Sequence, residues 1–262
     1  MRDYLYELNA GGFMLLAGCV TSVFASEPAL RAIVSDTNTP PYAIFNQYQQ
    51  LAGGLSKDIL DELAGLTQSE VVYLDLPRAR VEQWLHSGEA DIACFLNPDW
   101  VEQPDKLLWS PPLFVTRQLF LRLAGSPAVS NLADLAGKRV GTTRGFTYPE
   151  LEQVFSLGDV VRDDAHSLQS NIQRLKQGRL DVVMSVDLSY YFYQQTLQDA
   201  DIVADPIWTE APAVFCALSS HNAKRAKALH QRLKHLVTSG FIQQRVNFYT
   251  AAADDVKALD HP

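Results

Sequence analysis

A duplicated unit constrains the fold of this chain more than any other feature of its sequence. Two segments, 71–96 and 160–186, share the order strand, helix, Gly-x-x-Asp turn, strand. The first begins with VVYLD and ends with IACFL, and the second begins with VVRDD and ends with VVMSV. In both, the glycine fits a left-handed cap that ends a helix, and the last strand is apolar as in parallel sheets. Segments 29–36 and 137–144 supply a first strand to each copy, so the sequence favours two α/β lobes over one long domain.

A crossover stretch, 107–123 (LLWSPPLFVTRQLFLRL), lies between the two copies. It predicts a strand that is apolar on both faces and is broken at Pro111 and Pro112. A second apolar strand, 212–218, is expected to return the chain to the first lobe. These features predict a first lobe made of 26–114 with 207–262, a second lobe made of 115–206, and a hinge of two strands.

Composition and charge exclude several classes of protein. The chain has 262 residues, of which 47% are hydrophobic and 20% charged, as in a soluble protein with room for two small cores. Its formal net charge of −8 argues against a nucleic-acid partner, because phosphate binding needs clustered cations. The basic residues between Lys224 and Lys234 fall on the polar side of a predicted helix, 223–238. The six histidines are scattered, so we expect neither a metal site nor a cofactor.

The first 25 residues predict an export signal. Residues 10–25 form an apolar run that is too short to span a bilayer and ends before Ser26, where a signal peptidase would cleave. The alternative is a lipobox at 16–19, in which Cys19 is lipidated and anchors the protein to a membrane. Both interpretations place the protein in the periplasm.

Two further cysteines, Cys94 and Cys216, lie inside apolar strands. An oxidising compartment permits a disulfide between them. Free cysteines are among the most buried residues, however, so we expect two buried thiols and keep the disulfide as the alternative.

Candidate ligand residues follow the predicted strands of the first lobe, since open α/β sheets bind ligands at the carboxyl ends of their strands. The loop after the first strand contains Asp36 and Tyr42, and the loop after IACFL contains Asn97 and Trp100. Three of these four have a structural alternative: Asp36 could cap the turn, Tyr42 could pack on the core, and Trp100 could cover its own loop.

Two arginines, Arg78 and Arg80, lie at the start of a helix after VVYLD. A helix N-terminus that carries guanidinium groups is suited to an anion. The alternative for each is an ion pair with a surface carboxylate.

The second lobe offers a glycine loop at the equivalent place. Arg144, Gly145, Phe146 and Thr147 run from a strand toward a helix, with Thr147 predicted to be the N-cap. Asp187, after the strand VVMSV, could hold a cationic group. The tyrosines that follow it are expected to be packing residues.

Several short motifs in this order resemble the bacterial extracellular solute-binding proteins of family 3. They are PPY after the first strand, the two Gly-x-x-Asp turns, SPPLF before the crossover, and NLADLAGKRVG at 131–141. The resemblance covers about 29–249. It implies a type II periplasmic-binding-protein fold, a monomer whose two lobes close on a small polar solute, usually an amino acid, and delivery to the permease of an ABC importer.

The sequence departs from the usual pattern of that family at the ligand. The family's Thr-x-x-Arg clamp for the α-carboxylate falls on Trp100 and Gln103, and its amino-group aspartate falls on Val186, one residue before Asp187. The run 77–80 instead resembles a branch of the family with a Pro-x-x-Arg signature. We therefore expect an amino acid or a related small organic anion, held by Arg78, Arg80 or Arg144.

Two other functions on this fold are weighed against transport. A periplasmic dehydratase would need an acid or base in the cleft, and no paired carboxylates or Ser/His/Asp arrangement is evident, so we do not expect an enzyme. A ligand-sensing module would have to act through a separate membrane partner.

Overall fold

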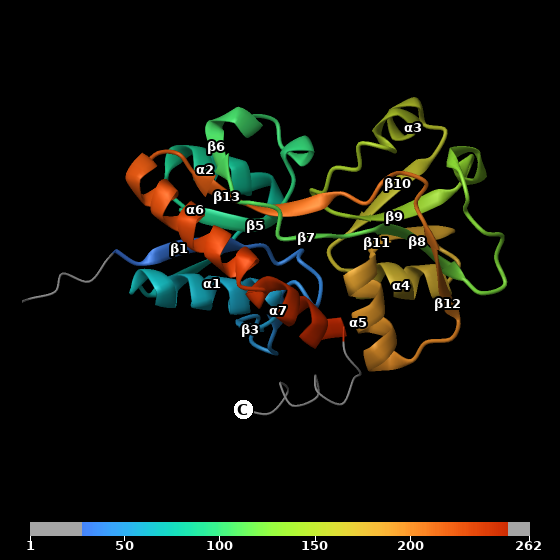
Figure 1. The fold of residues 1–262 in the computed structure, drawn as a ribbon. Helices are drawn as coiled ribbons and strands as arrows, with labels where there is room; N and C mark the ends of the chain where they lie inside the picture. Colours follow the sequence, from blue (N-terminus) through green and yellow to red (C-terminus); the bar gives the residue numbers. More distant parts are fainter. Residues whose placement is uncertain (1–27, 251–262) are drawn as a thin grey trace, which may run out of the picture.

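Two separate β-sheets, one in each lobe, organise the chain (Figure 1). The computed structural model describes residues 28–250. The predicted signal peptide, 1–25, and the alternative lipidation site, Cys19, lie outside the described residues.

The sheet of the first lobe has the strand order β4-β1-β5-β13-β6, with β7 paired to β13. The parallel strands β4, β1 and β5 form one side, and β13 runs antiparallel to β5, β6 and β7. The bounds are β1 (Leu30–Val34), β4 (Val71–Asp75), β5 (Ile92–Leu96), β6 (Leu107–Trp109), β7 (Phe114–Val115) and β13 (Ala213–Ser219). A small hairpin, β2 (Ile44–Phe45) with β3 (Leu51–Gly53), stands apart.

Four helices cover this sheet, namely α1 (Leu55–Thr67), α2 (Val81–Ser87), α6 (Ala223–Thr238) and α7 (Phe241–Thr250). In α1 the fully buried Leu55, Ile59 and Leu63 follow the four-residue spacing of one helix face, and the fully buried Leu60 lies beside them. In α6 the buried Leu229 and Leu233 have the same spacing. Lys224, Lys227, Arg232 and Lys234 are exposed on its outer side, as the periodicity predicts. Arg225 is the exception, since it is half-buried and lies 3.2 Å from Asp91.

The sheet of the second lobe has the strand order β10-β9-β11-β8-β12. Its bounds are β8 (Gln118–Leu123), β9 (Arg139–Thr143), β10 (Val161–Ala165), β11 (Val182–Val186) and β12 (Ile202–Pro206). The helices of this lobe are α3 (Glu152–Leu157), α4 (Leu168–Lys176) and α5 (Asp187–Leu197). Two apolar clusters, one around Phe120 and Val140 and one around Leu121 and Val183, fill the two faces of the sheet.

The duplicated unit produces the same local structure in both lobes. In the first lobe, the backbone N–H of Asp91 donates to Arg31 O of β1 at 2.8 Å. In the second lobe, the backbone N–H of Asp181 donates to Arg139 O of β9 at 2.9 Å. Each carboxylate accepts the N–H of that same arginine, at 2.8 Å in both lobes. Because β5 and β11 belong to different sheets, the predicted two-lobed α/β fold is confirmed.

The crossover stretch consists of three short strands, so it is interrupted at the prolines, as predicted, and a second time between β7 and β8. Strands β6 and β7 belong to the first lobe and β8 to the second, and Pro111 and Pro112 lie in the gap between β6 and β7. Proline lacks the N–H that a sheet ladder requires, so the pairing stops there. The chain changes sheet again between β12 and β13.

The prediction of two buried free thiols is wrong, because Cys94 and Cys216 form a disulfide. The reason lies in the sheet: β5 and β13 are antiparallel neighbours, and the two cysteines are direct partners in their register. Opposite residues of an antiparallel pair have Cβ atoms close enough for such a bond.

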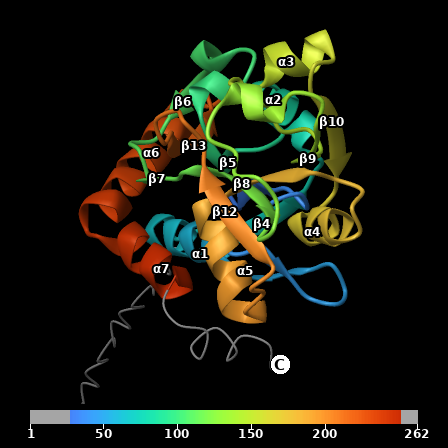
Figure 2. The same cartoon turned by 90° about the vertical axis from the view of Figure 1, so that its right-hand side faces the viewer.

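An apolar cluster below the hinge joins the two lobes. It contains Tyr42 and Leu55 of the first lobe, Leu188 of α5, and Val246 and Tyr249 of α7. Figures 1 and 2 both show α7 beside α5. The C-terminal helix therefore packs on the second lobe as well as on the first.

The described part of the chain contains no helix that is long and apolar enough to cross a membrane. Within residues 28–250 there is also no group of three His, Cys, Asp or Glu side chains arranged to hold a metal ion.

An ion pair at the edge of the second sheet predicts a pH dependence. Asp205 accepts hydrogen bonds from Arg122 Nε (2.7 Å) and Nη2 (3.1 Å) and from Val129 N (2.8 Å). Burial alone would raise the pKa of Asp205, but these bonds outweigh burial and lower its pKa below the ordinary value. A carboxylate with a lowered folded-state pKa stabilises the fold above about pH 4, and this contribution is lost as the pH falls.

We therefore expect Asp205→Asn to lower the free energy of unfolding by about 1.5–3 kcal/mol at pH 7. The difference from the parent should shrink as the pH falls below about 4, because Asp205 of the unfolded chain then takes up a proton, while the folded carboxylate with its lowered pKa does so only at lower pH. Urea unfolding at pH 7 and pH 3 measures both values. A difference that stays constant between these pH values would contradict the assigned role of the carboxylate.

Candidate ligand site between the lobes

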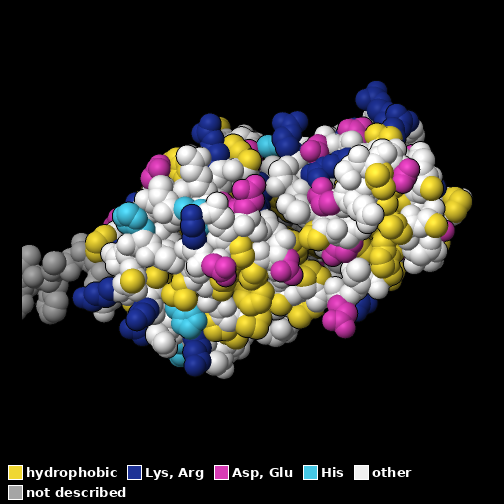
Figure 3. All heavy atoms as spheres, turned by 90° about the horizontal axis from the view of Figure 1, so that it is seen from above, with side chains coloured by type: hydrophobic (Ala, Val, Ile, Leu, Met, Phe, Trp, Pro, Cys, Tyr) yellow, Lys and Arg dark blue, Asp and Glu magenta, His cyan; other side chains and the backbone are white. Residues whose placement is uncertain are grey.

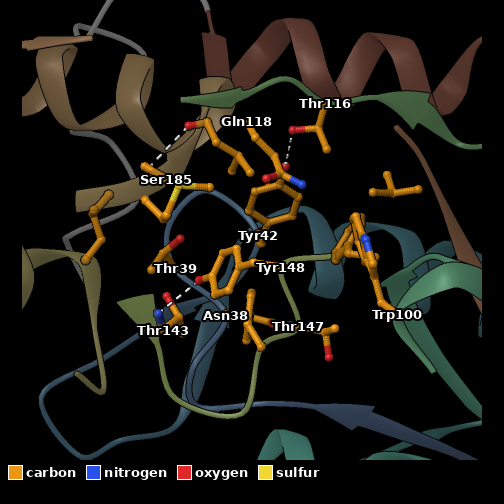
Figure 4. Close-up of a pocket in the computed structure, with 16 residues that line it drawn as sticks. Asn38, Thr39, Tyr42, Trp100, Thr116, Gln118, Thr143, Thr147, Tyr148 and Ser185 are labelled. Atoms are coloured by element: carbon orange, nitrogen blue, oxygen red, sulfur yellow. Dashed lines mark hydrogen bonds between the residues drawn. The ribbon is translucent and has the colours of Figure 1, made fainter. Parts of the chain in front are cut away.

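A cavity of about 110 Å³ lies where the two lobes meet (Figure 4). The first lobe contributes residues that follow β1 and β5, and the second lobe contributes residues at the ends of β9 and β11. The crossing segments supply Thr116, Gln118 and Val214. The cavity is thus at the carboxyl ends of parallel strands from both sheets, where folds of this kind bind ligands.

The wall from the first lobe is largely aromatic. Tyr42, Phe95 and Trp100 line it, together with Asn38 and Thr39. The Phe95 ring lies edge-on to Tyr42 at a centroid distance of 5.0 Å and 5.9 Å from Phe114. Such aromatic pairs fix the ring positions beyond what burial alone would do.

Phe95 has an unusual backbone conformation, with φ at 63°. It lies where the register between β5 and β13 shifts, so it is the extra residue of a β-bulge. A bulky residue in the left-handed region costs about 1–3 kcal/mol, and such residues gather at functional sites. Without the bulge, the Phe95 side chain would follow the alternation of the strand. The bulge turns it so that its ring forms part of the cavity wall.

The hydroxyl of Tyr42 connects the cavity to the hinge. It is 3.1 Å from Thr116 Oγ1, and Thr116 donates to Asp187 Oδ1 at 2.9 Å. Burial raises the pKa of Tyr42, so its phenol is uncharged at neutral pH. Tyr42 therefore both packs and lines the cavity, which unites the two alternatives considered from sequence.

The wall from the second lobe is the loop after β9. Thr143 donates its backbone N–H to the Tyr148 hydroxyl at 3.0 Å, which closes the loop around Phe146 and Thr147 (Figure 4). The prediction that Thr147 is an N-cap is wrong, because α3 begins at Glu152 and its N-cap residue is Leu151. The longer loop leaves Thr147 free to line the cavity.

Four of the predicted ligand residues therefore meet at one cavity: Tyr42, Trp100, Phe146 and Thr147. The other seven lie elsewhere in the structure.

Three of these seven have structural partners. Asn97 donates to Ala213 O (2.8 Å) and caps the turn that follows it. Asp187 accepts from Thr116 and from the backbone N–H groups of Arg117 and Leu188 (3.0 and 2.8 Å). Asp36 lies 3.4 Å from His166, which links the first lobe to the second.

The predicted cations and the glycine beside them lie outside the lining of the main cavity. Arg78 borders a smaller neighbouring cavity of about 50 Å³, donates to Trp100 O (3.1 Å), and lies 3.7 Å from Glu82. Burial lowers the pKa of Arg78. Gly145 of the second lobe lies against it, since a Cβ on this glycine would be 3.2 Å from Arg78 Cβ. Arg80 and Arg144 are exposed.

Sequence reasoning missed several lining residues, notably Gln118, Met184 and Ser185. Gln118 is 5% exposed, and its Oε1 is buried without a hydrogen-bond partner among the described residues. A signal for it existed, since an amide at the start of an apolar strand needs a partner. The prediction of a strand that is apolar on both faces did not take Gln118 into account.

No family model matches the chain. Among curated proteins it matches a protein of Shewanella frigidimarina (strain NCIMB 400) named as a candidate sensor, with 24% identity over 132 residues. That match covers 50% of this chain and 20% of the other protein, so the chain spans about a fifth of its length.

Among solved structures, an ancestral arginine-binding protein bound to arginine superposes with a TM-score of 0.72 at 19% identity, over 86% of this chain and 99% of that one. A protein from a study of glutathione import through GshT and the cystine importer TcyBC of Streptococcus mutans gives 0.72 at 17% identity, over 87% and 96%. The ligand-binding core of GluR0 with L-glutamate gives 0.69 at 16%, over 87% and 100%. The chain thus has the two-lobed α/β fold of these ligand-binding proteins.

Proposed function

We propose that this chain is an exported binding protein that holds one small solute in the cavity between its lobes. The observation that carries the proposal is the cavity itself, which takes its walls from both lobes and from the crossing segments. A solute there would contact both lobes at once and would stabilise the arrangement in which they meet. The sequence division at 114/115 and 206/207 is our proposal for the two bodies that move.

We propose that the protein, once it has bound its solute, delivers the solute to the permease of an ABC importer. The similarity in fold to binding proteins of amino-acid importers supports it. The Pro-x-x-Arg branch suggested by residues 77–80 and the periplasmic location stay part of this proposal. No catalytic role is proposed, because the cavity lining offers hydroxyls, amides and apolar groups rather than an acid or base pair.

A sensory role is the second candidate, and the partial match to the Shewanella protein favours it. A carrier and a sensor would bind the solute in the same way, but the carrier would pass the solute to a permease and the sensor would pass a signal to a membrane partner. Loss of the gene should abolish uptake of the solute if the protein is a carrier. If it is a sensor, uptake should continue and the cellular response to the solute should be lost.

A thermal-shift screen against amino acids, polyamines, sugars, organic anions and neutral ring compounds tests the binding function. A solute that binds only the folded state stabilises it by mass action and raises the melting temperature. At a hundred times its Kd, the free energy of unfolding increases by about 2.7 kcal/mol.

A blocked variant makes the screen specific to the cavity. Thr147→Trp places a large ring in the exposed loop that lines the cavity and should remove the shift. Thr196→Trp, at an exposed position of α5 outside the lining, should retain it. A shift that survives Thr147→Trp would place the solute elsewhere.

A further inference from the structure

The chemical character of the solute can be inferred from the cavity, and this inference rests on the proposed function. We propose that the cavity binds a small planar molecule that is uncharged at neutral pH and carries an amide-like group, which pairs with the side-chain carboxamide of Gln118. This differs from the small organic anion expected from the sequence.

The first observation is the charge of the lining. Among the described residues that line the cavity there is no Asp, Glu, Lys, Arg or His. A charged ligand group would lose its water on entry without gaining a counterion, and such a transfer is strongly unfavourable. Charged side chains are found instead on the outer surface, where Lys and Arg are interspersed with Asp and Glu on the face seen from above (Figure 3).

The two ionisable groups that bond to lining residues of the cavity, Asp187 at Thr116 and Arg78 at Trp100, are already paired within the protein. Asp187 accepts three hydrogen bonds, from Thr116, Arg117 and Leu188, and lies behind the Thr116 hydroxyl. Arg78 donates to Trp100 O and has Glu82 beside it. Taking either group for a ligand would break these contacts.

The second observation is the unpaired side-chain oxygen of Gln118. This residue begins β8 and pairs with Val186 in the sheet, so its backbone is fixed. Its side chain lines the cavity, the residue is 5% exposed, and Oε1 is buried without a partner in residues 28–250. A buried amide without partners is unfavourable, and most buried polar groups in proteins are paired. A ligand that completes its hydrogen bonds would gain affinity and specificity.

The third observation is the shape and size of the space. The rings of Tyr42, Phe95 and Trp100 line one side and Phe146 the other. The volume of about 110 Å³ is close to that of the engineered cavity of about 150 Å³ that holds benzene in another protein. We therefore expect a molecule with a single ring rather than a larger one. Because a carboxamide both donates and accepts, its complement is a group with an N–H beside a C=O.

Benzamide and benzoate are matched probes for this inference, because they have nearly the same shape and differ in charge. Isothermal titration calorimetry of the purified protein should show saturable binding of benzamide. Benzoate should bind at least about tenfold more weakly, because its charge has no counterion in the cavity.

Two variants test the carboxamide. Gln118→Leu keeps the size of the side chain and should weaken benzamide binding about tenfold, the effect of losing one buried hydrogen bond. It should also raise the melting temperature, because it removes an unpaired buried amide. Gln153→Leu, at an exposed glutamine of α3 outside the lining, should leave binding unchanged.

Other outcomes would overturn the inference. Benzoate binding as tightly as benzamide, with the binding lost in Arg78→Ala and kept in Gln118→Leu, would establish an anion site at Arg78. A lower melting temperature of Gln118→Leu would mean that the carboxamide supports the fold instead. Failure of benzamide to bind would reject the amide class, whereas the proposed function fails only if no solute in the thermal-shift screen binds.

Discussion

Asp91→Ala is expected to lower the free energy of unfolding by about 3 kcal/mol. The Asp91 side chain is 7% exposed and lies 2.8 Å from Arg31 Nη2 and 3.2 Å from Arg225 Nη2. It also accepts the backbone N–H of Arg31 at 2.8 Å. Removing one partner of a buried ion pair leaves charges and an N–H group unpaired, which typically costs about 3–5 kcal/mol. We take the lower end because Arg31 is 42% exposed and regains water.

The duplicated turn supplies a matched control. Asp181 occupies the same place in the second lobe and accepts the N–H of Arg139 at 2.8 Å, but it is exposed. Asp181→Ala should therefore change the free energy of unfolding by less than about 1 kcal/mol. Urea unfolding of both variants, followed by circular dichroism, measures the difference. Equal effects of the two substitutions would show that burial and the two arginines add nothing at Asp91.

Local sequence patterns predicted most of the architecture. The Gly-x-x-Asp turns place the same backbone hydrogen bonds in both lobes because each depends only on a helix end and the strand beside it. The helix over 223–238 follows from leucines at one helical spacing. Patterns of this kind are readable because the pattern itself is local or repeats at a fixed period, even where the bonded partner, as with Arg31 and Asp91, is 60 residues away.

The lining of the cavity was harder to predict, because it depends on contacts between distant segments. Nothing near Gln118 in the sequence shows that its carboxamide lacks a partner. That depends on the packing of β8 beside β11. Arg78 presents the opposite case, since its position after a strand indicates a ligand site, while its guanidinium reaches Trp100 O, 22 residues away. Residue type and position along a strand therefore locate the cleft but do not decide which side chains line it.

The disulfide shows the same limit. Cys94 and Cys216 are separated by 122 residues, and only the register of β5 with β13 makes them neighbours. The amino-acid pattern around each cysteine is that of a buried strand, which a free thiol fits equally well.

The second large effect concerns this disulfide, and we expect its removal to lower the free energy of unfolding by about 2–4 kcal/mol. A cross-link across so long a separation restricts the unfolded chain strongly, which is the main source of stabilisation in the loop-entropy account. The Cys94→Ala/Cys216→Ala double variant should unfold at a lower urea concentration than the parent. Dithiothreitol should lower the parent's midpoint toward that of the double variant and leave the double variant unchanged.

The Cys94→Ala/Cys216→Ala double variant should also alter the cavity, because Cys94 immediately precedes Phe95. The left-handed backbone of Phe95 is held by the pairing of β5 with β13, which the disulfide ties together. Without the bond, the bulge can relax and the Phe95 ring can leave the cavity wall. We therefore expect the double variant to bind any solute found in the screen several-fold more weakly at a temperature where it is still folded. Unchanged affinity together with lower stability would show that the aromatic contacts of Phe95 with Tyr42 and Phe114 hold the bulge without the disulfide.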